Sequence, residues 1–227
     1  MINSISLKGL EKQYGPGGFS INIESLEFHN RQIHVIVGPN GSGKSALLNI
    51  LALLESPDKG TIRLNGEQIC SVNGRRRALQ RKIGFVRQSP YLFNMDVFEN
   101  VALGLRMRKY RHNEIISRVN AILTALKIEH IKNRNVGSLS GGEYQKAAIA
   151  RVLVLEPEVI LMDEPTANID RESVLSIEET VRNIRRKYNS IVIMTTHSLD
   201  QAFRMSHDII SLSDGRLIEE RISYAGI

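Results

Sequence analysis

The chain contains a single cysteine and no tryptophan among its 227 residues. Because a disulfide needs two cysteines, Cys70 cannot form one within the chain, which favours a reducing compartment such as the cytosol. No apolar run approaches the roughly 18 residues of a membrane-spanning helix, since Glu156, Pro157 and Glu158 interrupt the most apolar stretch. The N-terminal sequence also lacks the apolar segment of a secretory signal. We therefore expect neither an integral membrane protein nor a disulfide-stabilised secreted one.

Negative charge is the scarcer sign, with 24 Asp and Glu against 30 Lys and Arg, which gives a net charge of +6. The basic residues concentrate at 75–82 and at 106–111. A basic surface can bind nucleic acid or an anionic membrane face. Here the charges lie among ordinary helix formers, a pattern that favours solvated helix faces. Charge alone does not identify a partner.

Three short apolar runs show no polar alternation: IHVIV at 33–37, VILM at 159–162 and IVIM at 191–194. Such runs predict strands buried on both faces, as in a parallel sheet covered by helices. Between the last two runs, apolar residues recur at helical spacing from Val174 to Tyr188, and Asp170 can cap this helix. Strand, helix and strand in this order predict a crossover unit.

Other parts of the chain have different patterns. Residues 4–7, 19–28 and 61–65 alternate apolar and polar, which predicts antiparallel strands with one solvated face. The stretch of about 89–156 is mostly helical in pattern, with loops at 94–96 and 133–137. We therefore predict a single α/β domain over 1–227, with a parallel core, an N-terminal antiparallel β subdomain and an inserted helical subdomain.

The segment GPNGSGKS at 38–45 matches the phosphate-loop pattern G-x-x-x-x-G-K-[ST] in the context that the motif requires. It follows the apolar run at 33–37 and precedes a helix expected at 46–54. This context predicts the core of a P-loop NTPase, in which backbone N–H groups and the helix N-terminus bind phosphates. Lys44 is expected to reach the β- and γ-phosphates, and Ser45 to coordinate Mg²⁺. The residues predicted to bind nucleotide here are Gly38, Pro39, Asn40, Gly41, Ser42, Gly43, Lys44, Ser45 and Ala46.

Two carboxylates, Asp163 and Glu164, end the apolar run at 159–162. The carboxyl edge of a parallel sheet is where α/β proteins bind ligands. Because successive strand side chains point to opposite sides, the two acids need not share a role. Asp163 suits the Mg²⁺ shell, and Glu164 suits activation of an attacking water. Without the phosphate loop, a cap on the following turn would explain the pair equally well.

The sequence LSGGE at 139–143 begins a helix that should extend to about Leu153, because Ser140 and Glu143 form a capping box. The capping box does not explain Gly141 and Gly142, since glycine costs a helix about 1 kcal/mol. We interpret both glycines as allowing an anion to approach exposed N–H groups.

LSGGE resembles the signature motif of ATP-binding-cassette (ABC) ATPases, and the resemblance extends over essentially the whole chain. Tyr14 matches the aromatic residue that stacks on adenine in that family. Gln88 matches the glutamine that contacts Mg²⁺ and senses the membrane partner, and 167–170 matches the D-loop that crosses to a second subunit. His197 matches the histidine that contacts the γ-phosphate. Packing at a strand end for Tyr14 and a core position for His197 are the alternatives.

The resemblance implies an ATPase that uses ATP and Mg²⁺ and works as a head-to-tail homodimer. Ser140, Gly141 and Gly142 of one subunit would contact the γ-phosphate held by the other. The implied catalytic residues are Lys44, Gln88, Glu164 and His197, and the implied Mg²⁺ ligands are Ser45, Gln88 and Asp163. The sequence departs from the family pattern at three positions without removing a catalytic group: Ala46 replaces a common threonine, Tyr144 a glutamine and Lys146 an arginine.

The stretch SPYLFNMDVFENVALGLRMR after Gln88 is similar to oxyanion-importer ATPases, particularly those for tungstate and molybdate. This similarity implies transmembrane permease subunits, a solute-binding protein as an indirect partner, and a place at the cytoplasmic face of the membrane. One alternative is a cell-division or lipid/macrolide-export ATPase. A DNA-repair or chromosome-structure ATPase normally carries a long coiled coil, and no sustained heptads separate Lys44 from Asp163. We therefore expect no nucleic-acid partner. A degenerate nucleotide-binding module is disfavoured because the catalytic residues are present.

Overall fold

The computed structural model describes residues 1–69, 73–167, 169–206 and 208–222, without the side chains of 73–75 and 219–222. Three features of the sequence analysis therefore lie outside the described residues: Cys70, Asn168 of the D-loop segment, and the side chain of Arg75 in the first basic run.

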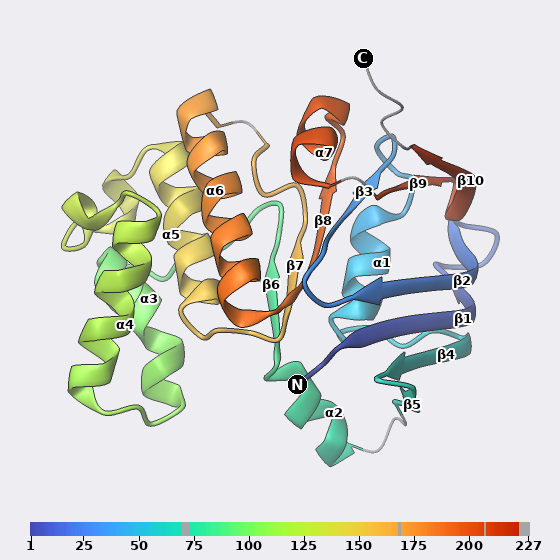
Figure 1. Ribbon diagram of the computed structural model, residues 1–227, viewed down its shortest axis with the longest axis horizontal. Coiled ribbons are helices and arrows are strands. Elements are labelled where there is room, and N and C mark those ends of the chain that lie inside the picture. The colour runs from blue at the N-terminus through green and yellow to red at the C-terminus, as the bar shows by residue number, and fades with distance from the viewer. Residues whose placement is uncertain (70–72, 168, 207, 223–227) are drawn as a thin grey trace.

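A six-stranded sheet forms the centre of the molecule in the order β10-β9-β3-β8-β7-β6 (Figure 1). Every neighbouring pair is parallel except β9 and β10. The three apolar runs predicted as strands are confirmed, and the third extends two residues further than expected. The strands are β3 (Ile33–Val37), β6 (Ile83–Val86), β7 (Val159–Met162), β8 (Ile191–Thr196), β9 (Ile209–Ser213) and β10 (Arg216–Ile222).

A second sheet of four antiparallel strands, in the order β2-β1-β4-β5, contains the predicted alternating segments. Its strands are β1 (Ser4–Gln13), β2 (Ser20–His29), β4 (Lys59–Leu64) and β5 (Glu67–Gln68). Strand β1 is longer than the predicted 4–7. The pairing register of β1 with β4 shifts between Lys8 and Glu11, and this irregularity interrupts the alternation from which the strand was predicted.

The helices are α1 (Lys44–Leu51), α2 (Asn73–Gln80), α3 (Val97–Met107), α4 (His112–Ala125), α5 (Gly141–Leu153), α6 (Arg171–Tyr188) and α7 (Leu199–Met205). The cap predicted for α6 is confirmed, since the Asp170 carboxylate accepts a hydrogen bond of 2.8 Å from the Ser173 N–H. The capping box of α5 is also confirmed. Helix α1 begins two residues and ends three residues earlier than predicted, because left-handed Gly43 at its N-cap makes Lys44 the first helical residue.

Between β6 and β7 the described chain is helical, as predicted, with α3, α4, α5 and the short 3₁₀ helices η1 (Glu129–Ile131) and η2 (Val136–Ser138). Helix η2 occupies part of the stretch predicted as a loop. Helices α3 and α4 lie on the far side of α5 from the central sheet (Figure 1). Within the described residues, none of the helices has both the length and the apolar character needed to cross a membrane.

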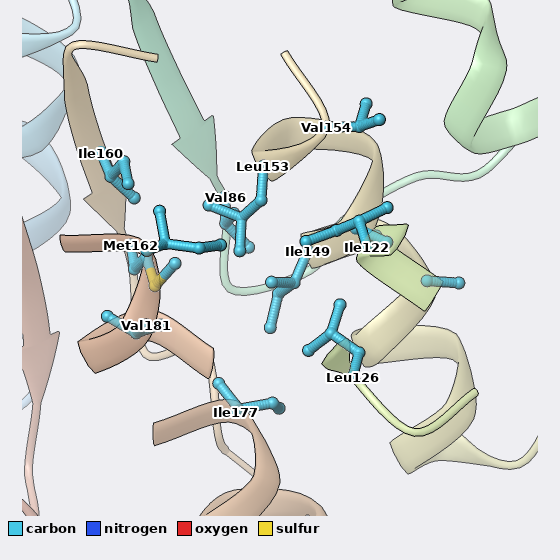
Figure 2. Close-up of a cluster of buried hydrophobic side chains, with 14 of the residues drawn as sticks. Val86, Ile122, Leu126, Ile149, Leu153, Val154, Ile160, Met162, Ile177 and Val181 are labelled. Atoms are coloured by element: carbon cyan, nitrogen blue, oxygen red, sulfur yellow. The ribbon is translucent and has the colours of Figure 1, made fainter. Parts of the chain in front are cut away.

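The central strands are buried on both faces, as their unbroken apolar runs predict. Ile160 and Met162 of β7 face α5 and α6 in one apolar cluster (Figure 2). Val159 and Leu161 of the same strand face α1 and the antiparallel sheet in a second cluster. Burial on both sides fixes the position of β7, and therefore of the two carboxylates that follow it.

Candidate active site

The loop between β3 and α1 packs closely against two other parts of the chain. A Cβ added at Gly38 would lie 2.1 Å from a backbone carbonyl oxygen of β9. Gly43 has φ 103°, and a Cβ there would lie 2.7 Å from a ring carbon of Phe19. The Gly215 N–H, in the turn between β9 and β10, donates a hydrogen bond of 3.0 Å to the Ser42 carbonyl. Close packing therefore requires glycine at both 38 and 43, and the left-handed backbone is a second requirement at 43.

Lys44 folds back over this loop. Its Nζ donates hydrogen bonds to the carbonyl oxygens of Gly38 at 2.8 Å and Pro39 at 3.0 Å, and lies 3.5 Å from Oε1 of Glu164. Only 5% of the side chain is exposed. The ammonium group is thus placed beside the N-terminus of α1, where backbone N–H groups and the helix dipole also favour an anion.

The two carboxylates after β7 have different partners, as alternation predicts. The buried Thr195 hydroxyl donates to Oδ1 of Asp163 at 2.8 Å and accepts the N–H of Glu164 at 2.9 Å. Glu164 has φ 43°, a left-handed conformation that is uncommon for a residue with a side chain. Gln145 of α5 donates to the Pro165 carbonyl at 2.9 Å. These contacts hold the turn at Glu164 in its strained conformation.

His197 follows β8 directly, and its Nδ1 lies 3.2 Å from Oε2 of Glu164. Ser198 caps α7, which fixes where the strand ends and the helix begins. The carboxylate of Glu164 therefore has Lys44 at one oxygen and His197 at the other. Three residues predicted from separate motifs meet at a single point.

An open pocket extends from this point over the phosphate loop. A Cβ added at Gly41 would meet nothing within 4 Å, so the loop is accessible from the pocket. Ser45, Gln88 and Asp163 offer hydroxyl, amide and carboxylate oxygens, which are the hard ligands that Mg²⁺ prefers. The donor set near the pocket fits a magnesium nucleotide. The pocket is lined by Phe19, Asn40, Gly41, Gly43, Lys44, Ser45, Ala46, Gln88 and Glu164.

An aromatic pair lies at the edge of the phosphate loop, with the ring centroids of Tyr14 and Phe19 6.0 Å apart. The Tyr14 hydroxyl donates a hydrogen bond of 2.6 Å to Glu55, and burial together with this bond raises the pKa of Tyr14 above its usual range. Phe19 lines the pocket, although the sequence assigns it only to a strand. In the sequence, the only feature that marks Phe19 is that it directly follows the paired glycines at 17 and 18.

The signature segment lies elsewhere, and Ser140, Gly141 and Gly142 are absent from the described lining of the pocket. A Cβ at Gly141 would meet nothing within 4 Å. A Cβ at Gly142 would lie 2.6 Å from Ser173 Oγ and 2.8 Å from Asp170 Oδ2, at the start of α6. Helix packing is therefore a further reason for glycine at 142, one that the interpretation from sequence did not include. Of the two signature glycines, Gly141 is the one with open space around its Cβ position.

Comparisons with known proteins agree with the family resemblance of the sequence motifs. A family model described as ABC transporter matches residues 21–167. The tungstate uptake system ATP-binding protein TupC of Peptoclostridium acidaminophilum is 37% identical over 95% of this chain and 97% of its own length. The molybdate/tungstate import ATP-binding protein WtpC of Pyrococcus horikoshii is 34% identical over 95% of this chain, which spans 61% of that longer protein. A bacterial ABC transporter cassette solved as a dimer has a TM-score of 0.86 and 31% identity, covering 98% of this chain and 100% of that one.

The chain therefore belongs to the ABC transporter family. The predicted α/β fold is confirmed, as is the prediction of an ATP-binding ATPase. The dimeric cassette is also known in a post-hydrolysis state bound to ADP and Pi. Further relatives at 35% identity are named for the import of Fe(3+) ions and of methionine, so family membership does not select a cargo.

Proposed function

We propose that this chain is the ATP-hydrolysing subunit of an importer and that Glu164 is the general base of the reaction. The observation that carries the proposal is the convergence of Lys44 and His197 on the Glu164 carboxylate, at 3.5 and 3.2 Å. A general base must reach the proton that it accepts, and Glu164 borders the open pocket above the phosphate loop. Lys44 and His197 would bind phosphate oxygens of the nucleotide.

Ser45, Gln88 and Asp163 are the proposed Mg²⁺ ligands. Bound Mg²⁺ would neutralise charge on the phosphate oxygens. Thr195 orients Asp163 by donating to one carboxylate oxygen, and this leaves the other oxygen free to accept a further contact. Tyr14 and Phe19 form the proposed surface for the adenine ring, because aromatic faces stack favourably on a flat base.

The second half of each site comes from a second copy of the chain. Ser140, Gly141 and Gly142 form the N-terminus of α5, where exposed N–H groups favour an anion, yet they do not border the pocket of their own chain. In a head-to-tail pair this helix would face the partner's phosphate loop. We further propose that 89–156 is a helical subdomain inserted in the cassette and that it carries this helix.

The proposed cargo is an oxyanion such as tungstate or molybdate, delivered by an extracytoplasmic solute-binding protein and passed through permease subunits. The similarity to TupC over 97% of that protein supports this choice. A membrane partner at the cytoplasmic face is supported by Tyr91 and Phe93, which follow Gln88. Their rings stack edge to face at 5.5 Å and remain 68% and 45% exposed, as a docking surface requires.

The test of the active site is Glu164→Gln, with Glu99→Gln as the matched control, since Glu99 pairs with Arg106 on the surface of α3. Glu164→Gln should lower kcat by about 100-fold or more and leave ATP binding intact, because the phosphate loop is unchanged. Phosphate release and equilibrium nucleotide binding measure the two effects. Undiminished hydrolysis by this variant would remove Glu164 from its proposed role.

The test of cargo requires the assembled transporter. The chain should be purified with its membrane partner and a binding protein, and the ATPase rate measured with tungstate, molybdate, sulfate and methionine in turn. Stimulation by tungstate or molybdate is expected. Stimulation by methionine alone would contradict the oxyanion assignment while leaving the ATPase assignment in place.

A further inference from the structure

A buried carboxylate outside the nucleotide pocket connects two helices near the active site. Glu178 of α6 has a side chain that is only 1% exposed. Its Oε1 accepts hydrogen bonds from Arg204 Nη2 at 2.9 Å and Gln201 Nε2 at 3.2 Å. Its Oε2 accepts from Arg204 Nε at 3.2 Å and Arg182 Nη2 at 3.3 Å. Both carboxylate oxygens are therefore used, and each accepts an arginine.

These contacts fix α7 along its length. Arg204, at the C-terminal end of α7, is held by Glu178, and its backbone carbonyl accepts a hydrogen bond of 3.1 Å from Arg182. Gln201, in the middle of α7, is 3% exposed and also bonds to Glu178. Helix α7 has only seven residues and begins two residues after His197. So short a helix depends on such tertiary contacts for its position.

The same network reaches the turn that carries Glu164. The Thr166 hydroxyl lies within hydrogen-bond distance of both amide atoms of Gln201, at 3.0 Å from Oε1 and 2.8 Å from Nε2. Thr166 is two residues beyond Glu164. A continuous set of polar contacts therefore runs from the Glu164 turn through Gln201 to Glu178.

We propose that Glu178 is a positioning residue for ATP hydrolysis, which acts through Gln201 and Thr166 to fix the spacing between Glu164 and His197. The inference rests on the roles proposed for those two residues. Stability alone does not explain why an ion-pair network connects these two helices. Desolvation of the charges is costly, so buried ion pairs are often no more stabilising than apolar side chains of similar size. What directional hydrogen bonds add is a defined geometry, which matters where two reacting groups must be held in register.

The test compares two variants, each of which removes one threonine hydroxyl. Thr166 is half-buried and Thr180 is buried. Thr166→Val breaks the link to Gln201 and leaves the ion pairs of Glu178 in place. Thr180→Val is the control, because Thr180 lies on α6 near Glu178 but its hydroxyl donates to the Ala125 and Ser176 carbonyls and takes no part in the network. In Mg–ATP, Thr166→Val should lower kcat about tenfold with the KM for ATP unchanged, whereas Thr180→Val should leave kcat as in the parent.

A second measurement separates positioning from general loss of stability. Hydrogen exchange of the nucleotide-free chain should become at least tenfold faster over 197–205 in Thr166→Val and stay as in the parent over that segment in Thr180→Val. Glu178→Gln should show the same acceleration and a larger loss of kcat, of about 100-fold. Should Glu178→Gln fail to fold, the threonine pair still decides the question.

The result that overturns the inference is equal kcat and equal exchange over 197–205 in the two threonine variants. That result is distinguishable from failure of the proposed active site, which Glu164→Gln tests separately. If Glu164→Gln is inactive and Thr166→Val is fully active, the proposal that Glu164 is the general base stands, and only the proposed positioning role of Glu178 is rejected.

Discussion

Gly141 and Gly142 are neighbours in the first turn of α5, yet an alanine at each position meets different surroundings. At Gly141 the added methyl group would project into open space. The substitution should then stabilise the chain by up to about 1 kcal/mol, the difference in helix propensity. At Gly142 the methyl group would displace the side chains of Asp170 and Ser173, and loss of the Asp170 cap costs about 1 kcal/mol. Overpacking adds about 1–3 kcal/mol, so Gly142→Ala should be destabilising overall.

Urea unfolding followed by circular dichroism measures both effects in a chain without tryptophan. The unfolding midpoint should rise for Gly141→Ala and fall for Gly142→Ala. Activity should not follow stability. The methyl group of Gly141→Ala would stand where a partner's γ-phosphate is proposed to approach, so the ATPase rate should fall at least tenfold while ATP binding by the separate chain is kept.

Two outcomes would refute this reasoning. A Gly142→Ala chain as stable as the parent would show that contact with α6 does not limit residue size there. A Gly141→Ala chain with full ATPase activity would show that no anion approaches the N-terminus of α5, and the proposed site shared between two subunits would have to be abandoned.

Further predictions address neighbouring contacts. Thr195→Val should lower the free energy of unfolding in urea by about 1–3 kcal/mol, because it leaves the buried N–H of Glu164 without an acceptor. It should also raise the Mg²⁺ concentration needed for ATPase activity, because Asp163 loses the hydrogen bond that orients it. An unchanged midpoint would contradict it. Tyr144→Phe removes the acceptor of the 2.8 Å bond from the Leu92 N–H and should raise hydrogen exchange at that amide at least tenfold, with basal ATPase activity unaltered; unchanged exchange would disprove the link. The bond from the N–H of Ser173 lowers the pKa of Asp170 below its ordinary 3.8. The ionised cap therefore stabilises the fold above pH 3.8, and this stability is lost as the pH falls through the lower folded value. Acid titration of Asp170→Asn, which keeps a cap acceptor, should lack that loss.

The parts of the fold that the sequence predicts are those with strong local signals. The strand at Ile33–Val37 and the capped helix after Asp170 are set by unbroken apolar runs, helical periodicity and cap chemistry. Strand β6 was not predicted because the glycine among its four residues interrupts the apolar run. Strand β9, which pairs with β3, was missed because two serines interrupt its apolar run.

The site residues likewise divide into those that a local motif identifies and those that only the tertiary structure brings together. The phosphate loop and the pair Asp163–Glu164 are contiguous motifs with known chemistry, so they could be found one by one. Phe19 could not be assigned to the pocket, because its position depends on how β2 approaches Gly43 in space. Among the partners of Glu178, Arg182 is one helical turn away on α6, but Gln201 and Arg204 are 23 and 26 residues away and reach it only in the tertiary structure.

The support that the β9–β10 turn gives to the phosphate loop has a consequence for synthesis on the ribosome. The Gly215 N–H that bonds to the Ser42 carbonyl is made about 170 residues after the loop at 38–45. Strand β3, which carries the loop, likewise pairs with β8 and β9, which are synthesised more than 150 residues after it. A nascent chain therefore has the nucleotide-binding sequence long before it has the binding site, and bound ATP can stabilise the fold only after the β9–β10 turn has been synthesised.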